Sequence, residues 1–453
     1  MLRVLGLATA VATMWTGAGT SPAREDGAAG DIDVATLLTA AHGAPPVICS
    51  MASQALWNGN FGGGADAPVT PLARVALRRG DGHGFALTDG EIRQLLEALS
   101  SDDACVRELS IRLLGHEEHS ATVREGLLSR LRESNPRLRE IAALGLGMIE
   151  GREVVQPLVA ALRDGEVGVR ANAAWALGRI EDGRALRPLR DLFADRSETV
   201  REAAVFAAGH FDDSTSSVAA LTRVLRDDEA ASVRRAAAWA LGQLEAREAV
   251  DALVAALGRE RDTPVREMAT WALGQIEDKR ATSSLVSTMR SDADDHVREV
   301  AAWALGQIED RSAADALGDV ASADKSARVR GTAAWALGQM EGASGDKAPA
   351  GLLRALRDES EDVRLKAAWA LGQIGDAGAI GAIRDALKQE KEQRVSRAMI
   401  RALIKSGEEN EAALTELLNS SDPEVREAAV RGLAGQSSFN PWPWPWPRPR
   451  PMP

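Results

Sequence analysis

The sequence contains no tyrosine and only 6 phenylalanines, and aromatic residues make up 4% of its 453 residues. Alanine and leucine carry much of the 45% hydrophobic content, as in helical proteins. Positive charge is not in excess either, because the formal net charge is −12. Phosphate binding needs a basic face, so this balance argues against nucleic acid as a partner.

Long apolar runs are also scarce. The run VLGLATAVATMW at 4–15 is too short to span a bilayer, and it follows the basic start MLR. Small residues at 16–18 and 21–23 offer cleavage sites, so residues 1–23 are typical of a secretory signal peptide. We therefore expect an exported protein, periplasmic or extracellular, with no transmembrane segment in the mature chain. The alternative is a frayed apolar N-terminus.

Cysteine is limited to Cys49 and Cys105. In an exported protein the two thiols can form a disulfide that ties the N-terminal segment to the rest of the chain. They can equally be two small buried residues with free thiols. The sequence leaves both interpretations open, because it does not give the distance between the two Cα atoms.

Recognisable catalytic motifs are absent: there is no Gly-rich phosphate loop, no GxSxG and no HExxH. The segment GHEEHS at 115–120 is the one dense cluster of metal-ligand residue types, and His116 and His119 could share a helix face. No third ligand has a suitable spacing, which favours a polar junction over a metal site. We expect no catalytic residues, no metal and no cofactor.

An internal repeat is what the sequence does have. The phrase AAWALGQIED at 301–310 returns as ATWALGQIED at 269–278, AAWALGQM at 333–340 and AAWALGQI at 367–374. The residues in the tryptophan column are Arg112, Leu144, Trp175, Phe206, Trp239, Trp271, Trp303, Trp335, Trp369, Arg401 and Arg431. Their spacing of 30–34 residues predicts about eleven stacked units over residues 91–436.

Each unit is predicted to contain two helices. In the unit at 249–276, the segment AVDALVAAL has an apolar stripe at helical spacing, and GRERDTP ends it. Pro264 then sits where a second helix can begin, with Asp262 or Thr263 as its N-cap. Gly274 lies within this second helix and recurs in other units, which indicates close packing of its backbone, such as against the next turn.

The two ends of the chain do not follow the period. Residues 24–90 are expected to form an irregular N-terminal cap with short helices at DVATLLTAAHG and VICSMASQALW, and with a Gly/Pro-rich loop at 58–71. Residues 437–453 end in FNPWPWPWPRPRPMP. The alternating prolines of this tail favour an extended polyproline II conformation.

The segment VREVAAWALGQIEDRSAADAL at 297–317 resembles a HEAT repeat of the short, phycobilisome-lyase-like type. This resemblance implies an all-α, right-handed solenoid whose second helices line the concave side. It also implies a ladder between repeats, formed by an Asp near the turn between helices and an Arg early in the second helix. The residues that match this pattern are Asp103/Arg107, Asp262/Arg266, Asp294/Arg298 and Asp422/Arg426, whereas Ser396 stands where an Arg is expected.

Two enzymatic families have similar repeats. Deoxyhypusine hydroxylases hold two irons with His-Glu pairs in several repeats, but this chain has a single pair at 116–117. Phycobilin lyases attach a bilin to an antenna protein inside the cell or plastid, which fits poorly with export. The resemblance therefore favours a non-catalytic scaffold that binds a protein. A lyase-type or enzyme-associated HEAT protein is the alternative.

The tryptophans are the lead on where a partner binds. On a helical wheel Trp271 lies near 240°, whereas the apolar residues of its helix cluster near about 20°. The indoles are therefore expected either to lie on the neighbouring repeat or to form an exposed platform for an extended or Pro-rich peptide. The candidate binding residues are Trp175, Trp239, Gln243, Trp271, Gln275, Trp303, Gln307, Trp335, Gln339, Trp369 and Gln373.

The tail is a candidate ligand for such a platform. PWPWPWPRPRP is extended and basic, whereas the protein is acidic, and its tryptophans are Trp442, Trp444 and Trp446. We expect it to dock on a groove of its own chain or of a neighbouring copy. The alternative is a tail that contacts a membrane interface or the cell wall through Trp and Arg.

Overall fold

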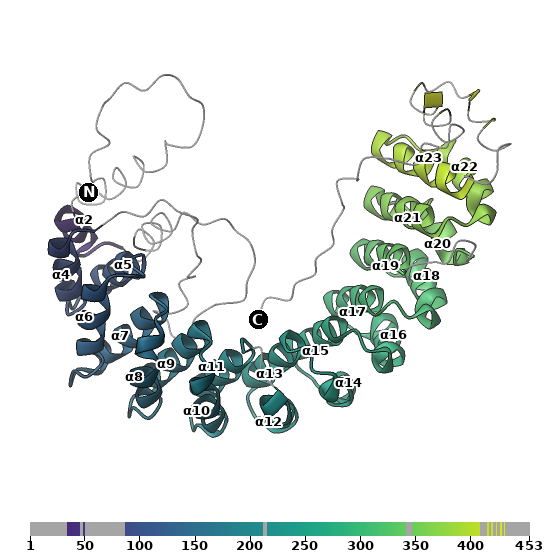
Figure 1. Ribbon diagram of the computed structural model, residues 1–453. Coiled ribbons are helices and arrows are strands. Elements are labelled where there is room, and N and C mark those ends of the chain that lie inside the picture. Colours follow the sequence, from purple (N-terminus) through teal and green to yellow (C-terminus); the bar gives the residue numbers. More distant parts are fainter. Residues whose placement is uncertain are drawn as a thin grey trace, which may run out of the picture. The chain divides into compact units, whose positions relative to one another are not determined.

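The computed structural model describes residues 34–45, 49, 87–211, 215–340 and 347–407, with isolated residues between 415 and 430. The regular structure in these ranges is helical, and the helices follow one another as antiparallel pairs (Figure 1). The chain divides into two compact units, Met1–Ala220 and a second unit that begins at Leu221. The predicted signal peptide, the loop at 58–71 and the tail lie outside the described residues.

Unit 1 is built from pairs of helices that stack in two layers. The helices of its first layer are α4 (Asp89–Ala98), α6 (Ala121–Arg130), α8 (Val155–Ala161) and α10 (Leu186–Asp191). The helices of its second layer are α5 (Ala104–Gly115), α7 (Pro136–Met148), α9 (Val167–Ile180) and α11 (Glu198–Ala208). The helix α2 (Val34–Ala41) packs on α4 and α5, which confirms the short helix predicted at DVATLLTAAHG.

Unit 2 continues the same pattern after α12 (Thr215–Asp227), which contains the boundary between the units. Its first layer contains α14 (Val250–Arg259), α16 (Thr282–Ser291), α18 (Ala314–Ala323), α20 (Ala350–Ala355) and α22 (Ile380–Leu387). Its second layer contains α13 (Ala231–Gln243), α15 (Thr263–Ile276), α17 (Asp295–Ile308), α19 (Ala327–Gln339), α21 (Glu361–Ile374) and α23 (Gln393–Gly407). Each second helix packs on the next one along the chain.

Local sequence explains where the helices begin. The Asp262 carboxylate accepts a hydrogen bond from the backbone N–H of Val265 and caps α15, while Pro264 occupies the first turn, where its missing N–H costs nothing. Asp294 caps α17 in the same way. Single-turn 3-10 helices lead into several first helices, as at Arg247–Ala249 before α14. Of the two N-caps predicted for α15, Asp262 is therefore the one that the structure shows.

The second helices approach each other closely through glycine and alanine. A Cβ atom on Gly274 of α15 would lie 2.6 Å from Cζ3 of Trp303 and 3.0 Å from Cα of Ala304, both on α17. Gly242 faces Trp271 and Ala272 of α15 in the same way. The glycine of one WALG segment therefore receives the Trp-Ala pair of the next repeat. The close packing expected at these glycines is confirmed, and the next second helix forms the contact.

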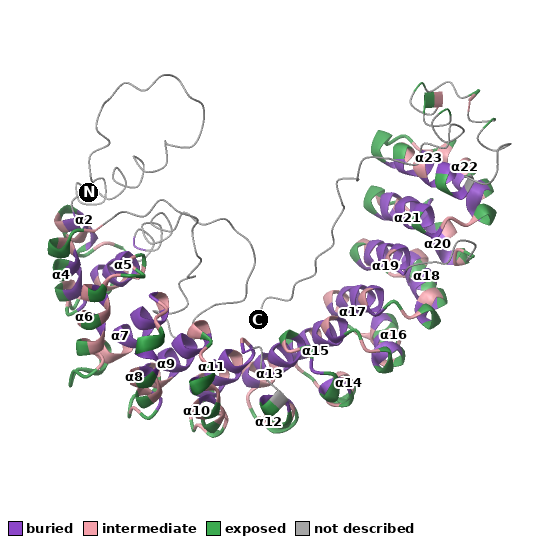
Figure 2. Cartoon of the chain, viewed as in Figure 1, coloured by how far each residue is buried: buried purple, intermediate pink, exposed green. Residues whose placement is uncertain are grey.

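The six tryptophans of the column are buried, with exposed fractions between 2% and 8%. Of the two interpretations that the sequence leaves open, packing of the indoles between repeats is therefore confirmed, and an exposed platform of indoles is wrong. Figure 2 shows the second helices as the most buried layer of each unit. The apolar arc on the helical wheel marks only the side of a second helix that faces the first helix of the same repeat. A second helix inside a stack also has a neighbour on each flank, so its buried arc is much wider.

This packing predicts that adding one methyl group at Gly274 lowers the stability of the fold. Gly274→Ala adds a Cβ that collides with Trp303, and overpacking of this kind costs about 1–3 kcal/mol, which outweighs the gain of at most about 1 kcal/mol in helix propensity. Gly258→Ala on α14 is the matched control, because no atom lies within 4 Å of its added Cβ. Thermal unfolding followed by circular dichroism should show a lower Tm for Gly274→Ala and an equal or higher Tm for the control. Equal shifts in the two variants would contradict this account.

Candidate functional site

A ladder of paired charges runs along the start of the second helices. In each rung an Arg of one second helix donates two hydrogen bonds to a carboxylate that lies just before the second helix of the next repeat. Arg266 Nε lies 2.9 Å from Asp292 Oδ2, and Arg298 Nε lies 2.8 Å from Asp324 Oδ2. The rungs of unit 1 are Arg139–Asp164 and Arg170–Asp195. The rungs of unit 2 are Arg234–Glu260, Arg266–Asp292, Arg298–Asp324, Arg330–Asp358 and Arg364–Glu390.

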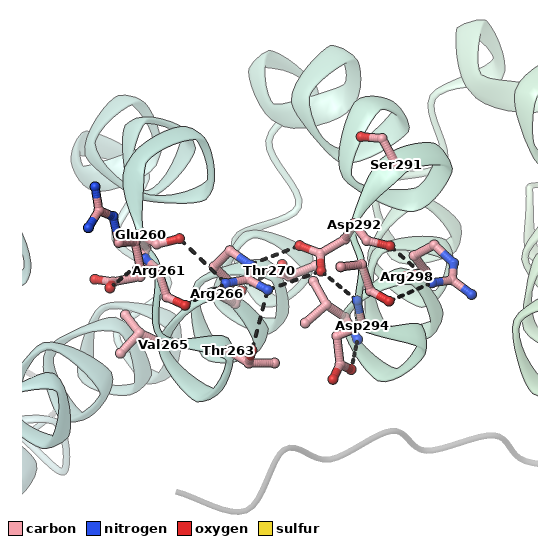
Figure 3. Close-up of polar contacts among 12 residues, drawn as sticks. Glu260, Arg261, Thr263, Val265, Arg266, Thr270, Ser291, Asp292, Asp294 and Arg298 are labelled. Atoms are coloured by element: carbon pink, nitrogen blue, oxygen red, sulfur yellow. Dashed lines mark hydrogen bonds and ion pairs between the residues drawn. The ribbon is translucent and has the colours of Figure 1, made fainter.

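Successive rungs in unit 2 interlock at single residues. Asp292 accepts hydrogen bonds from Arg266 through its carboxylate and, at 3.0 Å, from Arg298 through its backbone carbonyl (Figure 3). Its carboxylate also accepts from the backbone N–H of Asp294, which fixes the turn. Each acidic residue therefore holds both its own turn and the preceding repeat.

The acidic partners expected from the resemblance are wrong by two residues. Asp103, Asp262 and Asp294 cap their own helices, and their carboxylates accept backbone N–H groups. The carboxylates of Asp292 and Glu260 take the place in the ladder instead. Asp422, the fourth expected partner, lies outside the described residues. The ladder itself is present in both units.

The ladder sets the ionisation of its carboxylates. A hydrogen bond from Arg234, together with backbone N–H donors, holds the pKa of Glu260 below its ordinary value in spite of partial burial. Arg139 lowers the pKa of Asp164 in the same way. These groups are structural, because every charged atom of the rung already has a partner.

A second polar group crosses three repeats of unit 2. His296 lies between two glutamates, with Nε2 3.0 Å from Glu267 Oε1 and Nδ1 3.3 Å from Glu299 Oε2. The ring can donate to both carboxylates only as an imidazolium. Glu299 also accepts from Thr332 and lies 3.6 Å from Arg328, both on α19. Burial raises the pKa of Glu267, although the charge of His296 opposes this shift. The group therefore joins α15, α17 and α19.

The glutamines that follow the tryptophans lie at the surface. Each stands four residues after a buried Trp, is exposed or half-exposed, and makes no side-chain hydrogen bond within the described part of the chain. We call these residues the glutamine row: Gln243, Gln275, Gln307, Gln339 and Gln373. The structure thus divides the predicted binding residues into buried tryptophans and accessible amides.

Unit 1 has no such row at the equivalent positions. Arg179 follows Trp175 there, its guanidinium carbon lies 5.6 Å from the centre of an indole ring, and it pairs with Glu150. His210 follows Phe206, with the two rings in an edge-to-face arrangement at 5.1 Å. These side chains use their polar atoms or rings within the unit. The tail residues Trp442, Trp444 and Trp446 lie outside the described residues.

A surface pocket of about 420 Å³ lies beside the ladder of unit 2. Its lining residues are Arg290, Asp292, Arg298, Asp319, Val320, Ala323, Asp324 and Lys325. Most of these charges are already paired, as in the 3.1 Å contact of Arg290 with Asp319. The pocket is therefore a product of the ladder rather than a separate site.

The cysteines form a disulfide, with their Cα atoms 5.6 Å apart. Of the two interpretations left open by the sequence, the structure shows the bridge between the N-terminal segment and α5. His116 and His119 are both exposed, and no group of three potential ligands for a metal ion occurs in the ranges that the structure describes. Within those same ranges no helix is both long and apolar enough to cross a bilayer.

The family follows from these repeats and from direct comparison. A model of the HEAT repeats matches residues 92–168, 124–209, 155–242, 218–306, 282–356 and 349–434. The chain belongs to the HEAT-repeat family, and its fold is an all-α solenoid. No curated protein matches the sequence.

Solved structures with a similar arrangement include proteins of several kinds. The complex of CpcE and CpcF of phycocyanin lyase from Nostoc matches at 24% identity over 55% of this chain and 93% of its own, with a TM-score of 0.34. Human deoxyhypusine hydroxylase matches at 22% over 56% and 96%, with a TM-score of 0.27. The karyopherin Kap121p, bound to the C-terminus of the phosphatase Cdc14p, matches at 18% over 77% and 46%, with a TM-score of 0.45. Similarity at this level assigns none of these activities to the chain.

The ladder predicts unequal roles for two arginines of one repeat. Arg298→Ala should lower the free energy of unfolding by about 3–5 kcal/mol, because it leaves the buried carboxylate of Asp324 without its partner. Arg290→Ala is the control: its pair with Asp319 is exposed, and its loss should cost about 1 kcal/mol or less. Urea unfolding of both variants measures the difference. Similar midpoints for the two would show that the ladder contributes little.

Acid should weaken the ladder. The pKa of Glu260 and that of Asp164 lie below their ordinary values of 4.5 and 3.8, so their ionised forms stabilise the fold above those values. That stabilisation is lost as the pH falls below those ordinary values and through the lower folded-state pKa of each group. The Tm of the wild type should therefore drop steeply between about pH 5 and 3. Glu260→Gln should start lower and drop less, whereas parallel curves would contradict this assignment.

Proposed function

We propose that this protein is a non-catalytic scaffold that binds another protein on the second-helix layer of unit 2. The glutamine row is the observation that carries the proposal. A primary amide offers two donors and an acceptor, and these amides have no partner in the described part of the chain. No hydrogen bond of the described fold uses their side chains, and they recur at the same position of five successive second helices of unit 2, from α13 to α21.

An extended segment is the shape that suits this row. A Gln amide can accept from a peptide N–H and donate to a peptide carbonyl, so it can hold a main chain whatever its side chains are. Neighbouring helices are about 8–10 Å apart, and an extended chain advances about 3.3 Å per residue. One amide would therefore meet about every third residue of the bound segment.

The buried tryptophans support this surface instead of forming it. Four of the indoles pack against a glycine of the preceding repeat, which fixes the helix that carries the following Gln: Trp271, Trp303, Trp335 and Trp369. A rigid row loses little conformational freedom when a partner binds, and this favours affinity.

We also propose that the protein acts after export, in the periplasm or outside the cell. The disulfide Cys49–Cys105 supports this location, because disulfides persist in oxidising compartments and are rare in reducing ones. The N-terminal sequence supports it independently, since residues 1–23 are typical of a signal peptide.

Site-specific crosslinking tests the scaffold. A photoreactive residue at Gln275 or Gln307 should give protein adducts in producing cells, which mass spectrometry then identifies. The same residue at Ser287, exposed on α16 of the first layer, is the matched control and should give few. Equal adducts at both layers, or none at the glutamines, would reject binding on the second-helix layer.

A further inference from the structure

A second row of side chains accompanies the glutamine row in three repeats of unit 2. Glu245, Glu277 and Glu309 each stand two residues after a member of the glutamine row. Two residues of chain span at most about 7 Å between Cα atoms, so the two rows lie side by side. All three glutamates are exposed, and their carboxylates form no hydrogen bond or ion pair with the described part of the chain. We call them the glutamate row.

The fold does not favour glutamate at these positions. Their φ angles are 45°, 55° and 53°, in the left-handed region where glycine is preferred. The chain has Gly375, with φ 69°, at the equivalent end of α21. A negative charge is also unfavourable at the C-terminal end of a helix dipole. Glutamate is therefore costly here both for the backbone and for the charge. Unit 1 has the same left-handed conformation at Glu150 and Glu181, but there Glu150 pairs with Arg179.

The acidic residues that follow two members of the glutamate row have partners, unlike the row itself: Asp310 accepts hydrogen bonds from Thr282 and from the backbone N–H of Ser312. Asp278 follows Glu277 directly and pairs with Arg280 at 2.9 Å. The glutamates thus provide negative charge without an ion pair at one position in each of three repeats, next to amides that have no hydrogen-bond partner in the described part of the chain. The amides can form hydrogen bonds with a peptide main chain, and the carboxylates can bind a cationic side chain of the same peptide.

We propose that the partner is an extended segment with a lysine or arginine at about every third residue. This inference rests on the function proposed above. A polyproline II segment advances about 3.1 Å per residue, so three residues match the spacing of about 8–10 Å between helices. Its main chain lies on the glutamine row, and its cations lie opposite Glu245, Glu277 and Glu309. The net charge of −12 favours encounter with such a segment.

Three synthetic peptides test this partner on the full-length protein. The first has five Arg-Pro-Ser units, the second has Gln in place of Arg, and the third is the chain's own tail, residues 439–453. Fluorescence anisotropy should give a Kd for the Arg peptide at least tenfold below that of the Gln peptide. The difference should shrink in high salt, because exposed charge pairs are screened. The triple variant Glu245→Gln, Glu277→Gln, Glu309→Gln should lose this preference and keep its affinity for the Gln peptide.

The other outcomes separate the two proposals. If the Gln peptide binds as tightly as the Arg peptide, and Gln243→Ala with Gln275→Ala and Gln307→Ala weakens both, the cationic partner is rejected and the scaffold remains. If neither peptide binds, the cationic partner is also rejected, and the crosslinking experiment decides the scaffold by itself. If the tail peptide binds at least as tightly as the Arg peptide, the occupant is the chain's own tail, which overturns the assignment to a partner protein.

Discussion

The close approach of consecutive second helices is the constraint on which the rest of the structure depends. It requires a residue without a side chain where the next helix crosses, and Gly274 against Trp303 and Ala304 is the clearest case. The indole of Trp303 then fills the volume beside this contact, so the large side chain of Trp and the absent side chain of Gly complement each other. Alanine fills the remaining positions because larger side chains would separate the helices.

The ladder of charges fixes how far one second helix is shifted along the next. An apolar interface of glycine and alanine resists separation but has little to stop one helix from sliding along another. A bidentate Arg–carboxylate pair has a narrow geometry, and Asp292 joins two such arginines through different atoms. The two devices are complementary: close packing sets the distance between repeats, and the ladder sets their alignment.

The sequence was sufficient for the period, the helices and the close glycines, because these depend on spacing along one chain. The sequence was insufficient where several neighbouring residues of the same type could each form a given contact. The segment SDADDHVR at 291–298 holds three aspartates before Arg298, and only the fold decides that Asp294 caps the helix while Asp292 pairs with Arg266. The burial of Trp303 was left open for a similar reason, since its contacts come from a neighbouring repeat.

Residues that hold the repeats together differ from the surface residues that are candidates for binding a partner. Trp, Gly, Ala, Arg and the ladder carboxylates all contact another repeat, so changing any of them disturbs the stack. The side chains of Gln307 and Glu309 form no hydrogen bond or ion pair with a described residue. Glu309 also has a left-handed backbone conformation that glycine would adopt more easily. A repeat can vary such positions without losing its neighbours. Glutamate also occupies the left-handed position at Glu150 and Glu181 of unit 1, where Glu150 pairs with Arg179 inside the fold. Within the described residues, a Gln without a hydrogen-bond partner beside a Glu without an ion pair is thus particular to three repeats of unit 2, and the proposed extended segment would match that period.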